Sequence, residues 1–134
     1  MNPIIKAGGI ITKTIDNKPH ILLIYRSKHK DWTFPKGHKD DTDPDAKYTA
    51  IREIKEETNL DTEIIKELPH MEWVNVKNEH VINYMYLMKN LETSEMKIEK
   101  DGDELRWVEI DQVNNLLDYN NLIEYFDSIK GEIN

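Results

Sequence analysis

The sequence predicts a single mixed α+β domain, and three observations lead to this prediction. The chain has 134 residues, which suits one domain with its own hydrophobic core. It shows neither an internal repeat nor a linker that would separate two domains. Apolar, β-branched runs predict strands and two further segments predict helices, in the order β-β-α-β-β-β-α. Residues 1–134 are therefore expected to form one α+β unit.

The expected strands are apolar runs bounded by polar turns. The first is "IIKAGGIITKTI", in which the Gly-Gly pair indicates a bulge or a close backbone approach. After a turn at residues 16–19, the continuous apolar run "HILLIYRS" predicts a strand buried on both faces. Later strand material is found in four segments: "EIIKEL", "HMEWVNV", "VINYMYLMKN" and "DELRWVEI".

Two segments carry helix signals. The first helix has Asp43 as its expected N-cap and Pro44 at its first helical position. It is expected to end at Thr58, with Asn59 in the left-handed conformation that terminates many helices. A last helix is expected from about Gln112 through "LIEYFDSI".

Composition and charge exclude several classes of function. The chain has no cysteine, which excludes disulfides and thiolate metal sites. The N-terminal segment lacks the pattern of a signal peptide and no apolar run is long enough to span a bilayer, so a cytoplasmic protein is expected. The net charge of -8 argues against binding to a nucleic-acid backbone or an anionic membrane. A small phosphorylated ligand remains compatible, because a bound divalent cation reverses the local field.

The first predicted helix has an unusual acidic side. Four charged residues lie within roughly 140° of one another around the helix axis: Arg52, Glu53, Glu56 and Glu57. Ile51, Ile54 and Thr58 fall on another side and are expected to meet the core. A Glu pair on a helix usually faces solvent, but three carboxylates on one side also suit a hard divalent ion such as Mg²⁺. The nearby "FPKG" turn adds a cation and an approachable backbone.

The segment "GHKDDTDPDAKYTAIREIKEETNL" resembles the signature of the Nudix hydrolases. That signature is Gly, five residues, Glu, seven residues, then Arg-Glu-apolar-x-Glu-Glu-x-Gly-apolar. Gly37 matches its first position and residues 52–60 match its end, except that Asn59 replaces Gly. The stretch from Gly37 to Arg52 is one residue longer than the pattern, and Asp43 stands at the count of the loop Glu. The resemblance implies the Nudix fold, a mixed β-sheet sandwiched between helices in an α/β/α arrangement.

The resemblance also implies a divalent-cation-dependent hydrolase that cleaves a nucleoside diphosphate linked to another group. Mg²⁺ is the expected cofactor and Mn²⁺ is a possible substitute. The implied metal ligands are Glu53, Glu56 and Glu57, with Arg52 orienting a carboxylate through a bidentate contact. The implied catalytic residues are Arg52, Glu53 and Glu57 from the signature, and a general base from the later loop, either Asp101 or Glu104. The alternative for both loop residues is a simple turn.

The turn "DWTFPKGH" is similar to that of the asymmetric diadenosine tetraphosphate hydrolases. This likeness implies that Lys36 meets a distal phosphate, with Gly37 in the same substrate-binding turn. Arg26 and His38 could add hydrogen-bond donors. Alternatively, Arg26 and Lys36 are ordinary surface charges; a phosphate role is favoured for Lys36, whereas neither interpretation is favoured for Arg26.

Adenine requires a flat apolar partner. Tyr84 and Tyr86 share one face of their strand and are candidates for stacking, with Tyr25 and Trp73 as further options. Each of these aromatic residues could instead belong to the core.

The implied reaction is cleavage of a dinucleoside polyphosphate, such as diadenosine tetraphosphate, to ATP and AMP. Two other enzyme functions stay open, which are RNA 5′-pyrophosphohydrolysis and the removal of oxidised nucleoside triphosphates. From another class, the chain could be a Nudix-like module that senses a nucleotide without cleaving it. The expected partner is a small nucleotide, rather than an extended nucleic acid or a membrane. The expected oligomeric state is a monomer or a weak dimer.

Overall fold

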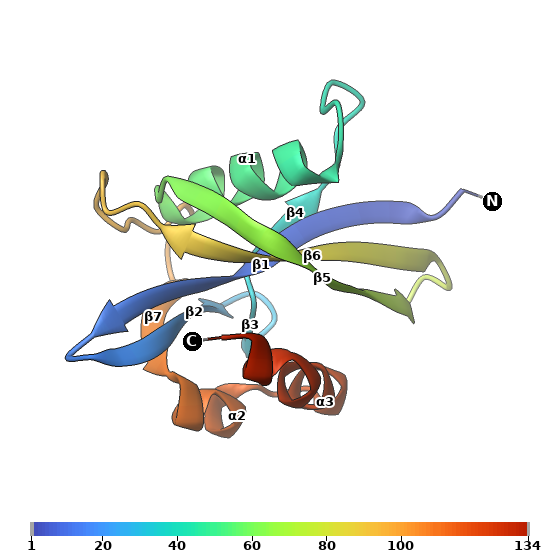
Figure 1. The fold of residues 1–134 in the computed structure, drawn as a ribbon. Coiled ribbons are helices and arrows are strands. Elements are labelled where there is room, and N and C mark those ends of the chain that lie inside the picture. Colours follow the sequence, from blue (N-terminus) through green and yellow to red (C-terminus); the bar gives the residue numbers. More distant parts are fainter. Residues whose placement is uncertain (1, 134) are drawn as a thin grey trace.

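The computed structural model describes residues 2–133, in which one mixed sheet is flanked by helices (Figure 1). The first five elements are β1 (Ile4–Ile15), β2 (Lys18–Arg26), β3 (Asp31–Thr33), β4 (Lys36–His38) and α1 (Ala46–Thr58). They are followed by β5 (Thr62–Val74), β6 (His80–Asn90), β7 (Glu104–Glu109), α2 (Val113–Leu116) and α3 (Asn120–Ile129). Short 3₁₀ turns precede α2 and follow α3, at Ile110–Gln112 and Lys130–Glu132.

The seven strands form one sheet with the order β3-β2-β1-β6-β5. β4 also pairs with β1, and β7 also pairs with β2. β1 and β6 run parallel, whereas the other pairs are antiparallel, so the sheet is mixed. The short strands β3 and β4, on either side of the "FP" turn, are not apparent from the sequence pattern.

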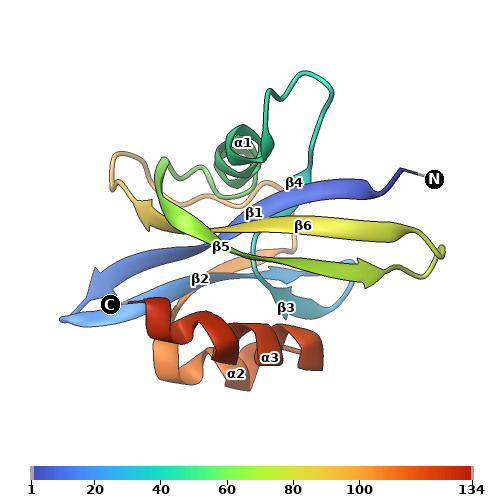
Figure 2. The same cartoon turned by 45° about the vertical axis from the view of Figure 1, so that its right-hand side comes forward.

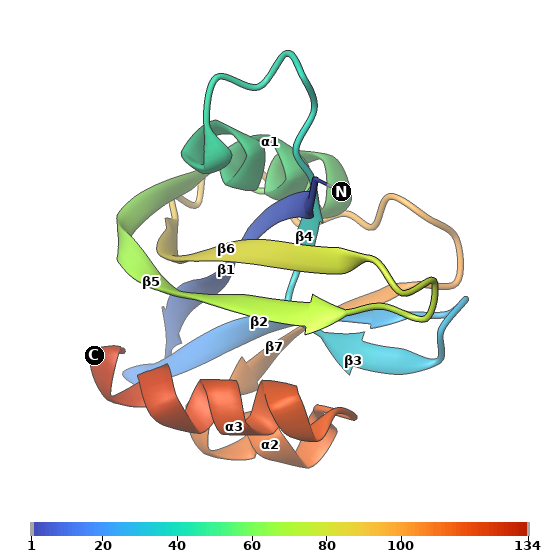
Figure 3. The same cartoon turned by 90° about the vertical axis from the view of Figure 1, so that its right-hand side faces the viewer.

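The helices cover both faces of the sheet (Figures 2 and 3). α1 lies on one face, while α2 and α3 lie together on the other. Each face has its own hydrophobic cluster, with Ile54 of α1 in one and Phe126 of α3 in the other. The predicted α+β class and the α/β/α arrangement are confirmed.

The alternation of side chains along the central strands supplies both clusters. Leu22 of β2 packs on the α1 side and Leu23 packs on the α3 side, and both are fully buried. Ile10 and Ile11 of β1 divide in the same way. This arrangement explains why the strand beginning at "HILLI" is continuously apolar, because successive residues of a strand point to opposite faces.

The Gly-Gly pair of β1 allows a close backbone approach, as the sequence predicts. A Cβ atom at Gly8 would lie 2.2 Å from the carbonyl oxygen of Pro35, and the Gly9 N–H donates to that oxygen at 3.3 Å. β4 pairs with β1 directly after this contact, with Lys36 opposite Gly8. The approach therefore fixes the turn that carries Lys36 and Gly37 onto the sheet.

The start of α1 differs from the prediction. The N-cap is Asp45, whose Oδ1 accepts from the Tyr48 N–H at 2.9 Å. Asp43 does not cap the helix, because its carboxylate is engaged by Arg52. The helix end agrees with the prediction, since Asn59 adopts φ of 65° after Thr58.

One residue of the expected core face of α1 is misplaced by the prediction. Ile54 and Thr58 are buried as expected, but 40% of Ile51 is exposed. Ala50, which is fully buried, contacts the sheet instead. The buried side of the helix is therefore displaced from Ile51 toward Ala50.

The expected last helix is in fact two helices. Leu117 has extended backbone at φ -62° and ψ 130°, and it separates α2 from α3. The next two residues contact β3: Asp118 accepts from the Trp32 N–H at 2.7 Å, and Tyr119 donates its hydroxyl proton to Asp31. These tertiary contacts outweigh the local preference for a continuous helix.

None of the helices in residues 2–133 has the length and apolar character needed to cross a membrane.

Candidate active site

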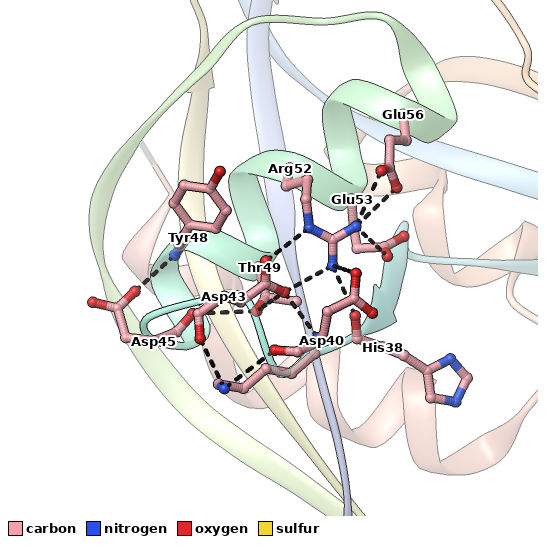
Figure 4. Close-up of polar contacts among 10 residues, drawn as sticks. His38, Asp40, Asp43, Asp45, Tyr48, Thr49, Arg52, Glu53 and Glu56 are labelled. Carbon is pink, nitrogen blue, oxygen red and sulfur yellow. Dashed lines mark hydrogen bonds and ion pairs between the residues drawn. The ribbon is translucent and has the colours of Figure 1, made fainter.

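Arg52 is the centre of the charged side of α1 (Figure 4). Its Nη1 donates to Oε1 of Glu53 at 3.0 Å and to Glu56 at 3.0 and 3.1 Å. Its Nη2 donates to the backbone oxygen of His38 at 3.0 Å and lies 3.5 Å from a carboxylate oxygen of Asp40. Arg52 therefore offsets the repulsion between the carboxylates, and it ties α1 to the loop after β4.

Asp43 is the principal partner of Arg52. Nε and Nη2 of Arg52 donate to the two Asp43 oxygens at 3.0 and 2.8 Å, which is a bidentate contact. Asp43 is buried, and it also accepts from the Thr49 hydroxyl and the Asp40 N–H. The hydrogen bonds from Arg52 hold the pKa of Asp43 well below its usual range. The sequence predicts a bidentate contact between Arg52 and a carboxylate. The partner is Asp43, which stands at the count of the loop Glu, rather than a Glu of the helix.

Glu53 lies between Arg52 and the β4 turn. A Cβ atom at Gly37 would lie 1.9 Å from Oε2 of Glu53, so only glycine leaves room for this carboxylate. Burial and the neighbouring Glu56 raise the pKa of Glu53, and Arg52 partly offsets the rise. Gly37 thus shapes the acidic site from β4.

Glu57 is the signature carboxylate that no protein group compensates by direct contact. Among residues 2–133, no hydrogen bond contributes to its pKa, which is raised to about 8 by burial and by the charge of Glu53. Lys36 partly offsets this rise. Burial and the positive charges of Arg26 and Lys6 lower the pKa of Lys36 itself to about 8. Lys36 and Glu57 therefore form the electrostatic junction between the β4 turn and α1.

A cavity of about 520 Å³ lies on the sheet face that carries α3. Its apolar walls include Trp73 and Met71 from β5 and Met85 from β6. Lys6, Arg26 and Lys36 also line it. The volume and the mixture of apolar walls with a few charged groups are typical of a small-molecule site.

A smaller recess of about 70 Å³ lies beside Glu57 of α1 and shares part of its lining with this cavity. Arg26 and Lys36 line both spaces, and Glu57 lines the recess. Glu99 and Lys100, from the loop before β7, complete the wall around Glu57. Neither Lys6 nor Glu99 is predicted from the sequence as a residue of the site. The pairing of β1 with β4 brings Lys6 to it, and Glu99 lies in an irregular loop whose sequence shows no regular pattern.

The predicted stacking residues lie on different faces of the sheet. Tyr86 is buried in the cluster under α1, and Tyr84 packs against that same cluster. Asn83 and Met85, which alternate with them along β6, line the large cavity. The structure does not bring the two tyrosines to the cavity, whereas it does place Trp73 there, with Lys36 Nζ 6.0 Å from the ring centre.

The two candidates for the general base also occupy different positions. Glu104 is exposed, and its carboxylate pairs with Arg106 at 2.6 Å. Leu105 and Trp107 pack on the α1 side, so the alternating Glu104 points to the opposite face from the acidic helix. Asp101 is exposed in the turn next to Lys100.

His38 contributes its backbone oxygen to Arg52, while its side chain is exposed beside β4. Burial of part of the ring and the nearby positive charge of Lys6 lower the pKa of His38. Arg26 and Lys36 line the recess together with Glu57, and Gly37 lies against Glu53, so the structure brings these three residues to the acidic helix.

The signature carboxylates fit a divalent cation chemically. As placed, the side chains of residues 2–133 contain no group of three or more acidic or histidine residues that could hold a metal ion. Arg52 contacts both oxygens of Glu56 and one oxygen of Glu53, so these oxygens face the guanidinium. Glu57 is partly buried and makes no direct ion pair within residues 2–133, and Oε2 of Glu53 faces Gly37. A cation would supply the positive charge that these oxygens lack, and the exposed Glu56 could turn to join them.

Comparisons with known proteins identify the family. The family model described as the NUDIX domain matches residues 6–127, so the chain belongs to the Nudix family. A crystal structure of a Caenorhabditis elegans Ap4A hydrolase in a binary complex is similar with a TM-score of 0.82 and 23% identity, over 97% of each chain. No curated protein matches this sequence.

Two other solved structures show how widely the fold is shared. The NUDIX domain of Shewanella oneidensis NrtR, complexed with ADP ribose, has a TM-score of 0.82 and 15% identity, over 100% of this chain and 90% of that one. A MutT NUDIX hydrolase from Burkholderia pseudomallei has a TM-score of 0.78 and 22% identity, over 96% and 99%. At these identities the likeness shows the fold, and the chain has the Nudix fold.

Proposed function

We propose that the chain is a Mg²⁺-dependent hydrolase that cleaves a phosphoric anhydride bond in a dinucleoside polyphosphate. The observation that carries this proposal is that Arg26 and Lys36 line both the large cavity and the recess beside Glu57. A nucleoside in the large cavity would direct its phosphates past these two cations and toward Glu57. Few other ligands combine an apolar ring, several negative charges and an affinity for divalent cations.

The residues of the chain have distinct tasks in this proposal. Trp73 offers a flat apolar face for a base, and base–aromatic stacking contributes roughly 1–3 kcal/mol. Lys6, Arg26 and Lys36 bind the phosphate chain between the base and the acidic helix.

The acidic helix provides the cation site. Glu57 and Glu53 would hold Mg²⁺, with Glu56 as an additional ligand, and Arg52 fixes the direction of Glu53. A divalent cation in this position neutralises phosphate oxygens and lowers the pKa of a bound water. Glu99 is a candidate for the general base alongside Asp101, because it lines the recess beside Glu57.

Two observations support a dinucleoside polyphosphate as the substrate. The turn "WTFPKGH" is similar to that of asymmetric diadenosine tetraphosphate hydrolases, and two similar solved structures are of a C. elegans Ap4A hydrolase. The phosphate-binding cations also stand between the base cavity and the acidic helix, so the scissile bond would lie away from the cavity-bound nucleoside.

Product analysis over a substrate panel tests the proposal. The panel contains diadenosine tetraphosphate, nucleoside triphosphates including an oxidised one, ADP-ribose and RNA with a 5′ triphosphate. We expect ATP and AMP in equal amounts from diadenosine tetraphosphate, only when Mg²⁺ or Mn²⁺ is present. If only the RNA, or only the oxidised triphosphate, yields products, the chain catalyses another Nudix reaction. Nucleotide binding without products from any substrate would contradict hydrolysis and favour a sensor.

A further inference from the structure

Arg26 occupies a position in the proposed site that requires a defined orientation. It lies at the end of β2 and lines both the large cavity and the recess beside Glu57. A guanidinium group binds phosphate through several N–H donors in a rigid plane, so its orientation decides which donors meet the ligand. An unrestrained arginine would lose side-chain freedom each time it bound a phosphate.

Asp31 fixes that orientation. Nε and Nη2 of Arg26 donate to the two oxygens of Asp31 at 2.8 and 2.6 Å. Only 2% of Asp31 is exposed, whereas the Arg26 side chain is 31% exposed. The carboxylate is therefore a buried anchor, and the guanidinium is the part of the pair that a ligand can reach.

Asp31 also contacts a second residue that lines the cavity, Tyr119. The Tyr119 hydroxyl, from the break between α2 and α3, donates to Oδ2 of Asp31. The adjacent Trp32 N–H donates to Asp118 at 2.7 Å, so two successive residues of β3 hold two successive residues of the helical break. Tyr119 lines the same cavity as Arg26.

A structural explanation alone does not account for this arrangement. A buried ion pair carries a desolvation cost, and a well-packed apolar pair of similar volume is often at least as stable. The charged pair nevertheless stands at the wall of a cavity, with one member exposed to it. Its placement is explained if the guanidinium meets an anion that enters the cavity.

We infer that Asp31 is a positioning residue, which presets Arg26 for the phosphate chain of a bound nucleotide and holds Tyr119 beside it. This inference rests on the proposed nucleotide site, but it concerns residues outside the Nudix signature. Asp31 itself touches no substrate. Its effect is on substrate binding through Arg26, whereas the acidic helix determines turnover.

The test compares kinetic and binding constants in four single variants and one double variant of the full chain. Asp31→Asn keeps the shape of the side chain but presents an amide to the guanidinium, and Arg26→Lys keeps the charge without the planar fork. Tyr119→Phe removes only the hydroxyl and leaves the Arg26 pair intact. Asp127→Asn is the control, because Asp127 also pairs with a cation, Lys130, but lines none of these spaces.

For diadenosine tetraphosphate with Mg²⁺, Asp31→Asn and Arg26→Lys should each raise KM by about tenfold, with kcat within about twofold of wild type. Their double variant should be little worse than either single variant, because both changes remove the same contact. Tyr119→Phe should produce a smaller rise in KM, and Asp127→Asn should match wild type. ADP affinity, measured by calorimetry without turnover, should fall in parallel with the rise in KM.

Several outcomes would overturn the inference. An Asp31→Asn protein that melts at a lower temperature but keeps the wild-type KM and ADP affinity would show a purely structural residue. Full additivity of the two changes would also overturn it. If the wild-type chain binds ADP but hydrolyses no substrate, the proposed hydrolysis is contradicted and the inference about Asp31 is not. In that case, a weaker ADP affinity of Asp31→Asn would still support the inference. If Asp31→Asn does not fold, Arg26→Lys and Tyr119→Phe decide: wild-type KM in both overturns the inference.

Discussion

Replacing Gly37 by alanine should separate the geometry of the acidic site from the stability of the fold. The added Cβ would lie 1.9 Å from Oε2 of Glu53, whereas ordinary contact begins at 3.4 Å. The Glu53 carboxylate must therefore move by about 1.5 Å, which is the difference between these two distances. Such a shift removes its 3.0 Å contact with Arg52 and displaces a proposed metal ligand.

The expected loss is large for activity and small for stability. A displacement of about 1 Å in a catalytic arrangement can cost on the order of 10²-fold in rate, so kcat should fall by about that factor. The three nearest atoms, Oε2, Cδ and Cγ, all belong to the flexible Glu53 side chain, which can rotate away. The free energy of unfolding should stay within about 1 kcal/mol of wild type, because glycine-to-alanine changes also lower the entropy of the unfolded chain.

Steady-state kinetics and urea unfolding of the same preparations provide the test. Gly131→Ala is the matched control, because nothing lies within 4 Å of a Cβ at that position, and it should retain both activity and stability. In a Glu53→Gln background, Gly37→Ala should add little further loss, since the group that it displaces is already impaired. Wild-type kcat in Gly37→Ala, or an equally large additional loss in that background, would refute the reasoning.

Three further predictions concern other parts of the site. Glu57→Gln should lower kcat by at least about 10²-fold and leave the fold intact; near-normal turnover would refute the assignment. In the metal-free protein the raised pKa of Glu57 should make wild type lose stability relative to Glu57→Gln as pH rises from about 4.5 to about 8, and Mg²⁺ should restore it, as urea unfolding across pH will show. Asp43→Asn should show the opposite pH dependence, because the lowered pKa of Asp43 stabilises wild type at neutral pH. The difference in unfolding midpoint between wild type and Asp43→Asn should therefore narrow in acid, and a constant difference would contradict this. Trp73→Ala should raise KM by roughly 5- to 150-fold, the equivalent of about 1–3 kcal/mol of stacking, while Tyr84→Ala should not; the reverse order would move the base to the other face of the sheet.

The sequence reveals those features of the fold and site that depend on local patterns. The continuous apolar run of β2 and the left-handed Asn59 follow from burial on two faces and from the backbone freedom of asparagine. The shared side of Arg52 and the three Glu residues follows from helix periodicity. These features require only neighbours along the chain.

Features that depend on distant segments could not be predicted in the same way. Period two places Tyr84 and Tyr86 on one face, but it does not say which face carries the cavity. The local sequence predicts that Asp43 caps the helix, whereas in the structure Asp43 is buried against Arg52. Lys6 reaches the site only because β1 pairs with β4. In each case, the role is set by a contact between residues that lie far apart in sequence or separated by an irregular loop.

Direct measurement of Mn²⁺ binding tests the central claim, that the carboxylates of α1 hold a cation for a polyphosphate. Electron paramagnetic resonance counts the free ion in titrations of wild type and Glu57→Gln, with and without a non-hydrolysable dinucleoside polyphosphate. The account predicts Mn²⁺ bound by wild type, more tightly when the nucleotide is present, and much weaker uptake by Glu57→Gln. Equal uptake by both proteins, or no binding by wild type even with nucleotide, would contradict it.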